Sequence, residues 1–354
     1  MSQSPLIAQP AENHAPAVET GTLGLTAVRG GICGGKPNAA RESSPTSYNI
    51  FQEAWWLDAV AEEDWDEVCV KRGNQIAARL PYVRKKKFGA KLLLQPRLTP
   101  YLGPWVRPST AKLTNRLAEE KELMQELIDS LPSHDLFHQS FDPEINWWLP
   151  FYWRGFQQTT RYTYRLMELG DLASLWLGVR ENIRREIRKA EKRVEVRTDL
   201  DIDDFARVWA MTFARQGQRL PVRLQVLRRL DWACELHRCR RIFFAVDSGG
   251  RIHAAAYIVW NADRAYYLMG GADPDLRQSG AASLVLWEAI QFASTVSKQF
   301  DFEGSMIEPI ERFFRAFGGQ YVPYSTVSKI GRRLGIAAGL YNAGSAMLGR
   351  CSRI

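Results

Sequence analysis

The sequence RQSGAA, at residues 277–282, stands between a strand-like run and a segment with helical periodicity. The run AYYLMG, at Ala265–Gly270, is predicted to be the third strand of an antiparallel meander. Ser283–Val296 has apolar residues at helical spacing and is predicted to be a helix. The first N–H groups of a helix lack internal partners and carry partial positive charge. A strand, a glycine-containing turn and a helix in this order predict a seat for a pyrophosphate group.

The side chains of this turn suit an anion. Gly280 and Ala282 are small enough for an anion to approach the backbone, and Arg277 and Gln278 carry side-chain donors. An ordinary helix start after a polar loop is the alternative. The predicted anion-binding residues are Arg277, Gln278, Gly280, Ala281 and Ala282.

Length and composition indicate the number of domains, the class of protein and the charge of its partner. The 354 residues fit two domains, and 45% hydrophobic with 24% charged residues is typical of globular proteins. Lys+Arg 47 against Asp+Glu 39 gives a net charge of +8, which favours an acidic partner such as a nucleic acid, a phosphorylated metabolite or an anionic membrane. Five scattered cysteines, no apolar run of membrane-spanning length and no secretory signal predict a cytoplasmic protein, with the inner face of the membrane as an alternative location.

Four segments follow from composition and periodicity. Residues 1–47, rich in Ala, Gly, Pro and Ser, are predicted to be a disordered leader. Residues 48–168 and 169–330 are predicted to be two domains of similar outline, each with helices and a hairpin or meander. Residues 331–354 form a basic tail, which is either a peripheral membrane contact or a plain packing segment.

The periodicity also predicts the elements of each domain. In the first, a helix follows Tyr48 and a hairpin turns at Arg72-Gly73-Asn74. The remaining predictions are a helix at Lys112–Ser130, strands at His134–Ser140 and Arg161–Met167, helices at Asn182–Val196 and Arg223–Cys239, a helix that begins at Asp201 or Asp203, a strand at Gln299–Phe302, a helix at Glu308–Phe317 and a closing strand at Tyr321–Lys329. Strands and helices mixed in this way predict the α+β class.

The pattern R-x-x-G-x-A between a strand and a helix resembles the acyl-CoA loop of the GNAT acyltransferase superfamily. Further stretches resemble its FemAB-related branch, which is built from two tandem domains. These stretches are FQEAWWLD at 51–58, TPYLGPW at 99–105, NIRREIRKA at 182–190, FDFEGS at 300–305 and RFFRAFGG at 312–319. The resemblance covers about residues 48–330 and implies two GNAT-like domains, each a mixed, mostly antiparallel sheet flanked by helices.

The resemblance also implies the reaction. An acyl group would pass from acyl-CoA, such as acetyl-CoA, to an amine, and no tightly bound cofactor or metal is expected. In this fold two neighbouring strands splay apart to admit the donor. Here these strands would be Ala265–Gly270 and Gln299–Phe302, and a backbone N–H on the first would stabilise the oxyanion.

An attacking amine must lose a proton, so the reaction needs a base. Glu303, at the end of the second strand, is the first candidate, and Asp273, beside the phosphate loop, is the second. Tyr324 and Tyr321 are candidate acids for the leaving thiolate. The alternatives are a Glu303 that caps its loop or pairs with Arg312, and half-buried sheet tyrosines.

The first domain has no R-x-x-G-x-A turn, because its corresponding segment, Arg107–Ala111, contains a proline and no glycine. A single donor site is therefore expected, and the first domain is free to hold the acceptor. From Val68 to Ala118 there are twelve basic residues and no acid, which favours an anionic acceptor such as a cell-envelope or polysaccharide precursor. The predicted acceptor-binding residues are Tyr82, Arg84, Lys86, Tyr101 and Trp105.

Two other functions stay open. One is aminoacyl transfer from charged tRNA in peptidoglycan bridge synthesis, and the other is non-catalytic binding of RNA or anionic lipid through the basic stretch. A metal site at Cys234, His237 and Cys239 is not expected, because on one helix Cys239 would point away from the other two. Buried thiols are the prediction there.

Overall fold

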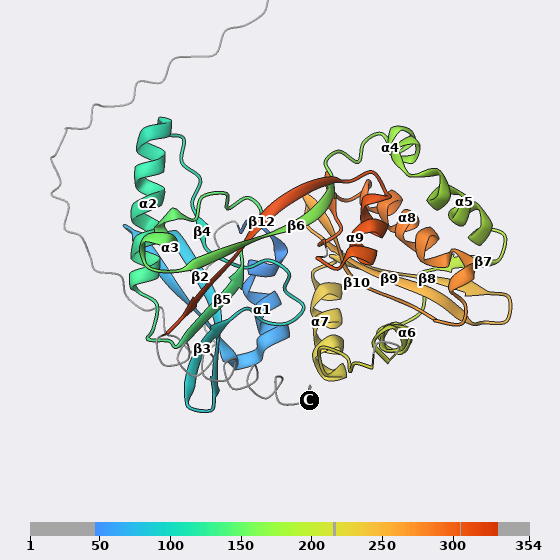
Figure 1. Cartoon of the computed structure of the whole chain (residues 1–354), viewed down its shortest axis with the longest axis horizontal. Coiled ribbons are helices and arrows are strands. Elements are labelled where there is room, and N and C mark those ends of the chain that lie inside the picture. The colour runs from blue at the N-terminus through green and yellow to red at the C-terminus, as the bar shows by residue number, and fades with distance from the viewer. Residues whose placement is uncertain (1–46, 215–216, 305, 332–354) are drawn as a thin grey trace, which may run out of the picture.

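The computed structural model describes residues 47–331, apart from residues 215, 216 and 305. The predicted leader and tail therefore lie outside the described residues, except for Ser47 and Gly331. The described chain forms two lobes joined by two long strands (Figure 1). The first lobe is mainly the N-terminal half of the chain and the second mainly the C-terminal half.

The N-terminal half begins with a short 3₁₀ turn at Ile50–Gln52, which Asn49 caps by accepting the N–H groups of Phe51 and Gln52. Its hairpin turns at Gly73, whose φ of +60° suits glycine. The elements are α1 (Ala54–Ala61), β1 (Trp65–Arg72), β2 (Gln75–Lys87), β3 (Ala90–Leu94), β4 (Trp105–Val106), α2 (Leu113–Asp129), β5 (Leu136–Ser140), α3 (Leu149–Trp153) and β6 (Gln157–Leu166).

The C-terminal half contains the antiparallel meander that the sequence predicts. Its middle strand is buried along most of its length, as expected for a strand covered on both faces. The elements are α4 (Leu172–Gly178), α5 (Glu181–Ala190), β7 (Val194–Arg197), α6 (Ile202–Ala214), α7 (Leu224–Leu236), β8 (Arg240–Asp247), β9 (Ile252–Trp260), β10 (Arg264–Ala272), α8 (Ala281–Ala293), β11 (Gln299–Asp301), α9 (Glu308–Arg315) and β12 (Gln320–Ile330).

One mixed sheet of twelve strands runs through both halves. Its order is β1-β2-β3-β5-β12-β6-β11-β10-β9-β8-β7, with β4 paired to β2. Most neighbours are antiparallel, while β3 with β5 and β10 with β11 are parallel. The mixed sheet and its flanking helices confirm the predicted α+β class.

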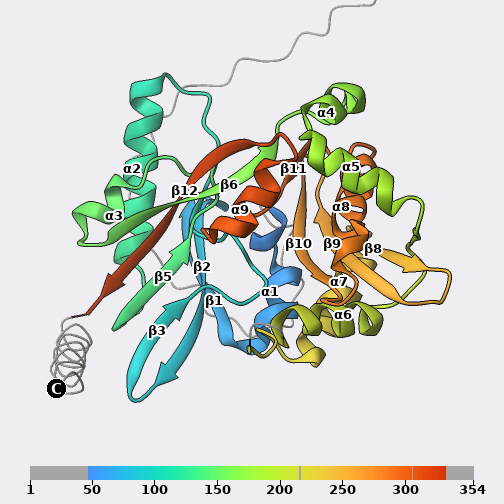
Figure 2. The ribbon, with the colours of Figure 1, turned by 45° about the vertical axis from the view of Figure 1, so that its right-hand side comes forward.

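The last strand of each half lies in the other half's part of the sheet. β6 ends the N-terminal half but pairs with β11, and β12 ends the C-terminal half but pairs with β5. The two strands also pair with each other from Gln157 to Arg165, and they form the bridge between the lobes in Figure 2. Because each half needs a strand from the other, we expect the two halves to fold together.

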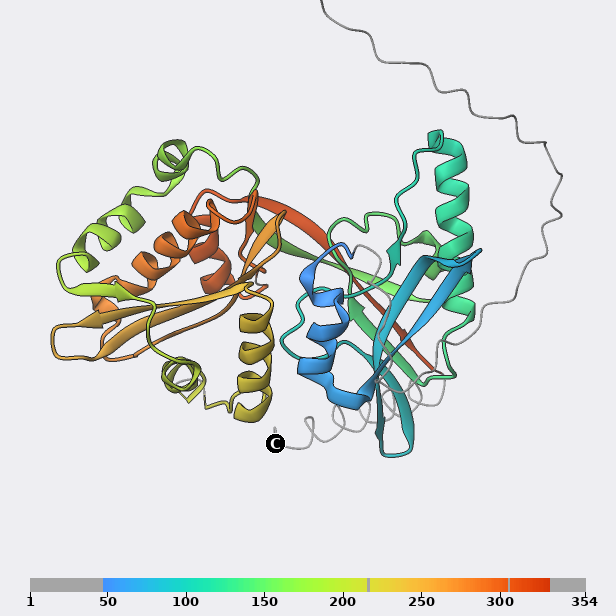
Figure 3. The ribbon, with the colours of Figure 1, turned by 180° about the vertical axis from the view of Figure 1, so that it is seen from behind.

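Three apolar cores pack against this sheet. One lies under α2 and α3, and another lies under α5, α8 and α9. The third spans the two halves, where α1 packs against α7, the two helices side by side at the centre of Figure 3. Trp56 of α1 and Leu230 of α7 are buried in this core. A fully buried shared core removes apolar surface of both halves from water, which stabilises their mutual position.

Two predicted elements differ from the observed ones. The helix predicted over Asn182–Val196 ends at Ala190, because Val194–Arg197 forms the edge strand β7 against β8. The strand predicted over Tyr321–Lys329 forms, but it lies between β5 and β6 and does not close the C-terminal part of the sheet. Both differences come from pairing with distant segments, which local periodicity does not encode.

Within the described residues, no helix combines the length and the apolar character needed to cross a membrane.

Candidate functional site

The parallel strands β10 and β11 separate after a short pairing. Arg264–Tyr266 pairs with Gln299–Asp301, and the register ends there. Beyond this point β10 continues along β9 to Ala272, whereas the N–H of Phe302 donates to the carbonyl of Tyr164 on β6 at 3.0 Å. The two chains therefore follow different neighbours, and the sheet opens between them.

The backbone of β10 is irregular at this opening. The register between β10 and β9 shifts between Tyr267 and Met269, so Leu268 is a bulged residue without a register partner. A bulge redirects a strand and releases backbone groups from the ladder. The bulge lies two residues beyond Tyr266, the last β10 residue paired with β11.

A buried carboxylate, Asp301, is the centre of a polar network beside the opening. Its Oδ1 accepts hydrogen bonds from the Thr163 hydroxyl at 2.6 Å and from the Glu303 N–H at 2.8 Å. Its Oδ2 forms an ion pair with Arg165 at 2.7 Å. Thr163 and Arg165 both belong to β6, so the strand that comes from the N-terminal half supplies the partners of this carboxylate. The network needs both halves of the chain.

Glu303 lies directly after this network, in a strained backbone conformation. Its φ is +57°, which is uncommon for a residue with a side chain. Gly304 follows with φ +60°, and a Cβ at that position would lie 2.2 Å from the Tyr162 carbonyl oxygen. The Asp301 side chain and the close approach of β6 therefore hold Glu303 in this conformation. Strain of this kind, held by its surroundings, is typical of functional sites.

The Glu303 side chain is half-buried, and one of its two carboxyl oxygens is buried without a hydrogen-bond partner. Its Oε1 is inaccessible to solvent and has no partner among the described residues, so the predicted alternative of an ion pair with Arg312 is not observed. Burial raises the pKa of Glu303 well above its usual range, and the nearby Asp301 adds to the increase. A carboxyl group with a raised pKa is suited to accept a proton near neutral pH.

Two tyrosines stand near this carboxyl group. The rings of Tyr101 and Tyr324 meet edge to face, with centroids 5.1 Å apart, and the Tyr101 hydroxyl lies 3.4 Å from Asp301. Burial raises the pKa of Tyr324, although the Arg161 guanidinium at 3.3 Å opposes the increase. The phenol therefore stays protonated at neutral pH and is able to donate a proton.

The predicted anion-binding turn begins α8. Arg277–Ser279 forms a 3₁₀ turn, and Gly280 adopts φ +81° before the helix begins at Ala281. Three of the five predicted anion-binding residues are exposed, namely Arg277, Gln278 and Ala282, whereas Gly280 and Ala281 are buried. The first turn of α8 contains no acidic residue that would repel an anion.

Helix α5 lies against this turn. A Cβ on Gly280 would lie 2.5 Å from the Glu186 carbonyl oxygen, so close packing by α5 requires glycine there. Ser283 donates to the Glu186 carboxylate at 2.8 Å, and the Lys189 ammonium donates to the Gln278 carbonyl. Lys189 thus adds positive charge beside the turn. Sequence reasoning assigned the basic side chains of this helix no place next to the turn.

Comparison with known proteins agrees with this geometry. Residues 178–304 match the family model described as "Acetyltransferase (GNAT) domain". The C-terminal half carries a GNAT domain. The chain is therefore an acyltransferase of the GNAT type, as the sequence predicted. None of the curated proteins has a sequence that matches this chain.

One solved structure shows the same fold over most of the chain, and others are similar to it over a comparable length. FemX is 13% identical, with a TM-score of 0.59 over 78% of this chain and 92% of its own. A tandem GNAT protein from the clavulanic acid biosynthesis pathway is 13% identical, with a TM-score of 0.47 over 78% and 94%. L-PGS from Bacillus licheniformis is 10% identical, with a TM-score of 0.45 over 76% and 85%. The likeness to FemX shows that the fold extends over both halves of the chain.

The second predicted base, Asp273, follows β10 of the GNAT domain. Its N–H donates to the His253 carbonyl at 3.0 Å, and its Oδ1 accepts the N–H of Asp275 at 2.8 Å. The side chain thereby closes the turn that leads to the donor loop. This arrangement gives Asp273 a structural role, whereas Glu303 retains an oxygen without a partner.

The five predicted acceptor-binding residues do not gather in one open cleft. Tyr82, Tyr101 and Trp105 are buried in the apolar cores, and among these Tyr101 reaches the GNAT domain through Asp301. Arg84 and Lys86 are exposed on the outer half of β2. The sequence interleaves aromatic and basic residues, but the strands turn the aromatic rings inward and the charges outward.

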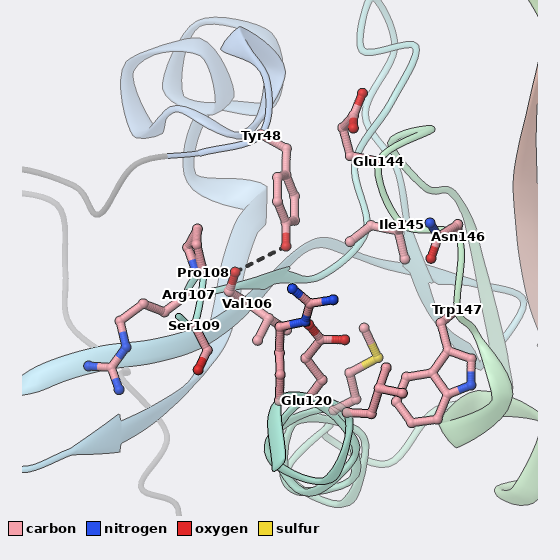
Figure 4. A pocket seen from close by; sticks show the side chains of 13 residues that line it. Tyr48, Val106, Arg107, Pro108, Ser109, Glu120, Glu144, Ile145, Asn146 and Trp147 are labelled. Atoms are coloured by element: carbon pink, nitrogen blue, oxygen red, sulfur yellow. Dashed lines mark hydrogen bonds and ion pairs between the residues drawn. The ribbon is translucent and has the colours of Figure 1, made fainter. Parts of the chain in front are cut away.

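A pocket of about 320 Å³ lies elsewhere in the N-terminal half, between α2, the end of β4 and the segment before α3 (Figure 4). Its walls combine Arg107, Arg116 and Asn146 with the apolar surface of Trp147. Glu144 also lines the pocket, and it pairs with Arg264 at 2.8 Å and Arg165 at 3.2 Å. Because Arg165 contacts Asp301, ion pairs connect the pocket with the opening in the GNAT domain.

Sequence reasoning missed the polar network of Asp301, Arg165 and Arg264. A signal for it exists, because Asp301 stands between Phe300 and Phe302, and Arg165 stands between Tyr164 and Leu166. A charged residue in such a place is buried only when it is paired. Arg165 and Asp301 lie 136 residues apart in the sequence, so their pairing cannot be read from spacing.

The cysteine-containing segment at the end of α7 supports the structural interpretation. Cys234 and Cys239 are buried as free thiols, and the His237 ring stacks on Trp55 at 4.2 Å. Among the residues that the structure describes, no cluster of His, Cys, Asp or Glu is arranged to hold a metal ion.

Proposed function

We propose that the chain transfers an acyl group from acyl-CoA, such as acetyl-CoA, to a primary amine of an anionic acceptor. The observation that carries this proposal is the opening between β10 and β11. The helix after one strand has no acidic residue in its own first turn, and Glu303 after the other strand has a buried carboxyl oxygen without a hydrogen-bond partner among the described residues. The start of α8 is suited to bind the donor's phosphates, and Glu303 is suited to accept the proton that the acceptor amine loses.

The donor would lie with its pyrophosphate at the start of α8. The exposed Arg277, Gln278 and Ala282 surround the helix N-terminus, and Lys189 of α5 stands beside them. Backbone N–H groups, the helix dipole and these cations all favour a bound anion. The thioester would extend along the opening toward the bulge at Leu268.

The amine nitrogen attacks the thioester carbonyl carbon and forms a tetrahedral oxyanion. A backbone N–H at the β10 bulge stabilises this oxyanion. Glu303 accepts the proton that the amine loses, directly or through one water molecule. The carbon–sulfur bond then breaks, and the thiolate of coenzyme A takes a proton from the Tyr324 phenol. An amide and a free thiol result, and the proton held by Glu303 returns to the Tyr324 phenolate, so that both side chains regain their starting charges.

The acceptor would approach from the N-terminal half. Tyr101 brings that half to Asp301. The pocket in Figure 4 offers Arg116, which lies 3.9 Å from Glu120, for an anionic group and Trp147 for an apolar or sugar ring. A cell-envelope or polysaccharide precursor that bears an amino sugar and a phosphate or carboxylate has this chemistry. Of the five acceptor contacts predicted from the sequence, the proposal keeps Tyr101 as a wall of the site.

Aminoacyl-tRNA is the second candidate donor, and the charge of α5 favours it. Arg185, Arg188 and Lys189 are exposed on this helix, next to the donor turn, and Lys192 follows it. An RNA backbone near the turn would meet these cations. With aminoacyl-tRNA as the donor, the acceptor chemistry and the role of Glu303 are unchanged.

Acyl transfer with each donor separates these possibilities. The full chain is incubated with acetyl-CoA and a panel of amino sugars and nucleotide-linked envelope precursors, and release of the coenzyme A thiol is measured. Thiol release that depends on an amine and disappears in Glu303→Gln supports the proposal. Transfer from charged tRNA alone shifts the donor to tRNA. Transfer from neither donor contradicts the proposed function.

A further inference from the structure

The tip of the β2–β3 hairpin carries an aromatic residue in an unfavourable place. Lys87 pairs with Ala90, so the loop consists of Phe88 and Gly89 alone, with φ of +50° and +80°. Two-residue loops in which both residues have positive φ favour Asn, Asp or Gly at the first position. A phenylalanine there is strained, and its side chain is 97% exposed. Burial within the described chain therefore does not account for the choice of Phe88.

The strand ends next to the tip are basic at every exposed position, namely residues 84–87 and Lys91. Residues 84–87 read RKKK and are all exposed, and Lys86 lies directly opposite Lys91 in the register. Like charges in directly opposite positions of a hairpin are destabilising. This is a second unfavourable feature at the same tip.

Acidic neighbours neutralise only the base of the hairpin. Asp66 pairs with Arg84, and Asp64 lies 4.0 Å from Lys85. Asp135 accepts the backbone N–H of Lys91. Among the side chains that the structure describes, no carboxylate lies within ion-pair distance of Lys86 or Lys87. The outer end of the hairpin thus keeps its positive charge.

The hairpin extends beyond the body of the protein, as Figure 2 shows at its lower edge. We propose that this tip docks on an anionic lipid membrane, with Phe88 inserted at the headgroup level and Lys86, Lys87 and Lys91 against the lipid phosphates. A single apolar side chain at the apex, with a ring of lysines behind it, fits a flat anionic surface. This inference does not depend on the proposed acyl transfer.

The same observations disfavour single-stranded RNA as the partner. RNA binding of this kind uses a groove with several exposed aromatic rings on which successive bases stack. The next aromatic residue along β2, Tyr82, is buried, so the described hairpin presents one ring alone. Lysines act as point charges and suit phosphates without fixed geometry.

The test uses the full chain and flotation with two kinds of vesicle, phosphatidylcholine alone and phosphatidylcholine mixed with phosphatidylglycerol. We expect binding to the mixed vesicles and none to pure phosphatidylcholine. Phe88→Asn is the informative variant, because Asn suits the positive φ and should keep or raise the unfolding temperature. It should lower vesicle binding about tenfold or more. The Lys86→Glu/Lys87→Glu variant should abolish it, and added salt should weaken it.

Arg223→Glu is the charge control, since it changes an exposed basic residue before α7 in the other half of the chain and should keep vesicle binding. Three results would overturn the inference. If Phe88→Asn binds the mixed vesicles as tightly as the wild type, another segment makes the contact with the membrane. A lower unfolding temperature in Phe88→Asn shows that Phe88 has a structural role. Loss of binding to single-stranded RNA in the tip variants, without any vesicle binding, assigns the tip to RNA.

Discussion

Each half of the molecule contains one pair of parallel strands, but the two pairs differ in whether the sheet stays closed beyond them. In the C-terminal half, β10 and β11 separate after Tyr266 and leave an opening. In the N-terminal half, β3 and β5 pair over Leu92–Leu94 and Leu136–His138, and the chain then closes the space between them. The N–H of Leu102 donates to the Ser140 carbonyl at 2.7 Å. The same arrangement of strands can thus leave an opening for a donor, as beside β10, or be closed by the chain, as beside β3. We call the closed region beside β3 and β5 the closed seam.

The closure depends on a few residues of the N-terminal half. The Gln95 side chain accepts the Ser140 N–H at 2.6 Å and donates to the Pro100 carbonyl at 2.9 Å. Gly103 has φ +80°, and a Cβ on it would lie 2.6 Å from the Phe141 ring. These contacts fill the position that corresponds to the opening beside β10. The comparison explains why one donor site is expected.

The carboxylates after the two strands also differ. Asp142 follows Phe141, and Glu303 follows Phe302. Asp142 accepts a hydrogen bond from Asn49 at 2.7 Å and lies 3.6 Å from Arg264. Glu303 has one oxygen with no partner in the described chain. The same position is therefore structural in one half and free for chemistry in the other.

The largest expected effect comes from neutralising these two acids in turn. Glu303→Gln should lower kcat/KM by about 10²–10⁴-fold, the usual contribution of a general base, without lowering the unfolding temperature. Asp142→Asn should lower the free energy of unfolding by about 1–3 kcal/mol, because it weakens a buried hydrogen-bonded pair. Steady-state kinetics and thermal unfolding of both variants test this contrast. Equal losses of activity in the two would contradict it.

The pH dependence of the wild-type rate sharpens the assignment of Glu303. Its pKa is raised by burial and by Asp301, so the group is protonated and inactive as a base below that pKa. We expect kcat/KM to rise with pH, about tenfold per unit on the acidic limb, up to the raised pKa. The folded state binds this proton more tightly than the unfolded state, so stability falls as pH rises between the two pKa values. A Glu303→Gln variant that keeps both dependences would contradict the assignment.

A smaller effect is expected where α5 meets the donor turn. Gly280→Ala adds a Cβ at positive φ, which costs about 1–2 kcal/mol, and also forces it against Glu186, which costs about 1–3 kcal/mol more. Gly250→Ala is a matched control, since Gly250 has φ +79° and no atom within 4 Å of the added Cβ. Chemical denaturation should show the larger loss at Gly280. Equal losses would mean that α5 does not press on the turn.

The smallest effect tests the closed seam. Gln95→Ala removes three side-chain hydrogen bonds near the end of β3, with Thr99, Pro100 and Ser140, and should lower the free energy of unfolding by about 1–3 kcal/mol. The number of coenzyme A molecules bound should stay at one, because the N-terminal half still lacks a glycine turn before α2. Appearance of a second equivalent in this variant would show that the side chain alone blocks a latent donor site.

The sequence predicted the elements whose signals are local. The meander and the order strand, turn, helix around Gly280 follow from periodicity and turn chemistry within about 50 residues, and the structure confirms them. The exchange of β6 and β12 between the halves was not predictable, because it joins segments about 160 residues apart.

The candidate site shows the same division. Spacing placed Glu303 at a strand end, but its strained φ and unpartnered oxygen depend on Asp301 and β6. Tyr82 and Trp105 were predicted to contact the acceptor because basic residues surround them in the sequence, but the structure buries both side chains. Strand alternation sends neighbouring side chains to opposite faces, and the fold decides which face is buried.

Calorimetric titration of coenzyme A and acetyl-CoA into the full chain tests the central claim, a single donor site at the start of α8. Ala282→Asp adds a carboxylate to the exposed first turn, where it favours the helix but repels phosphate. Gln225→Asp makes the same change in the first turn of α7 and is the matched control.

One equivalent should bind to wild type and to Gln225→Asp. Arg277→Ala and Ala282→Asp should each bind about tenfold more weakly or worse, a change of about 1.4 kcal/mol or more. Two equivalents in wild type would contradict the difference between the halves. No binding up to about millimolar concentration, near −4 kcal/mol, would contradict the acyl-CoA donor itself.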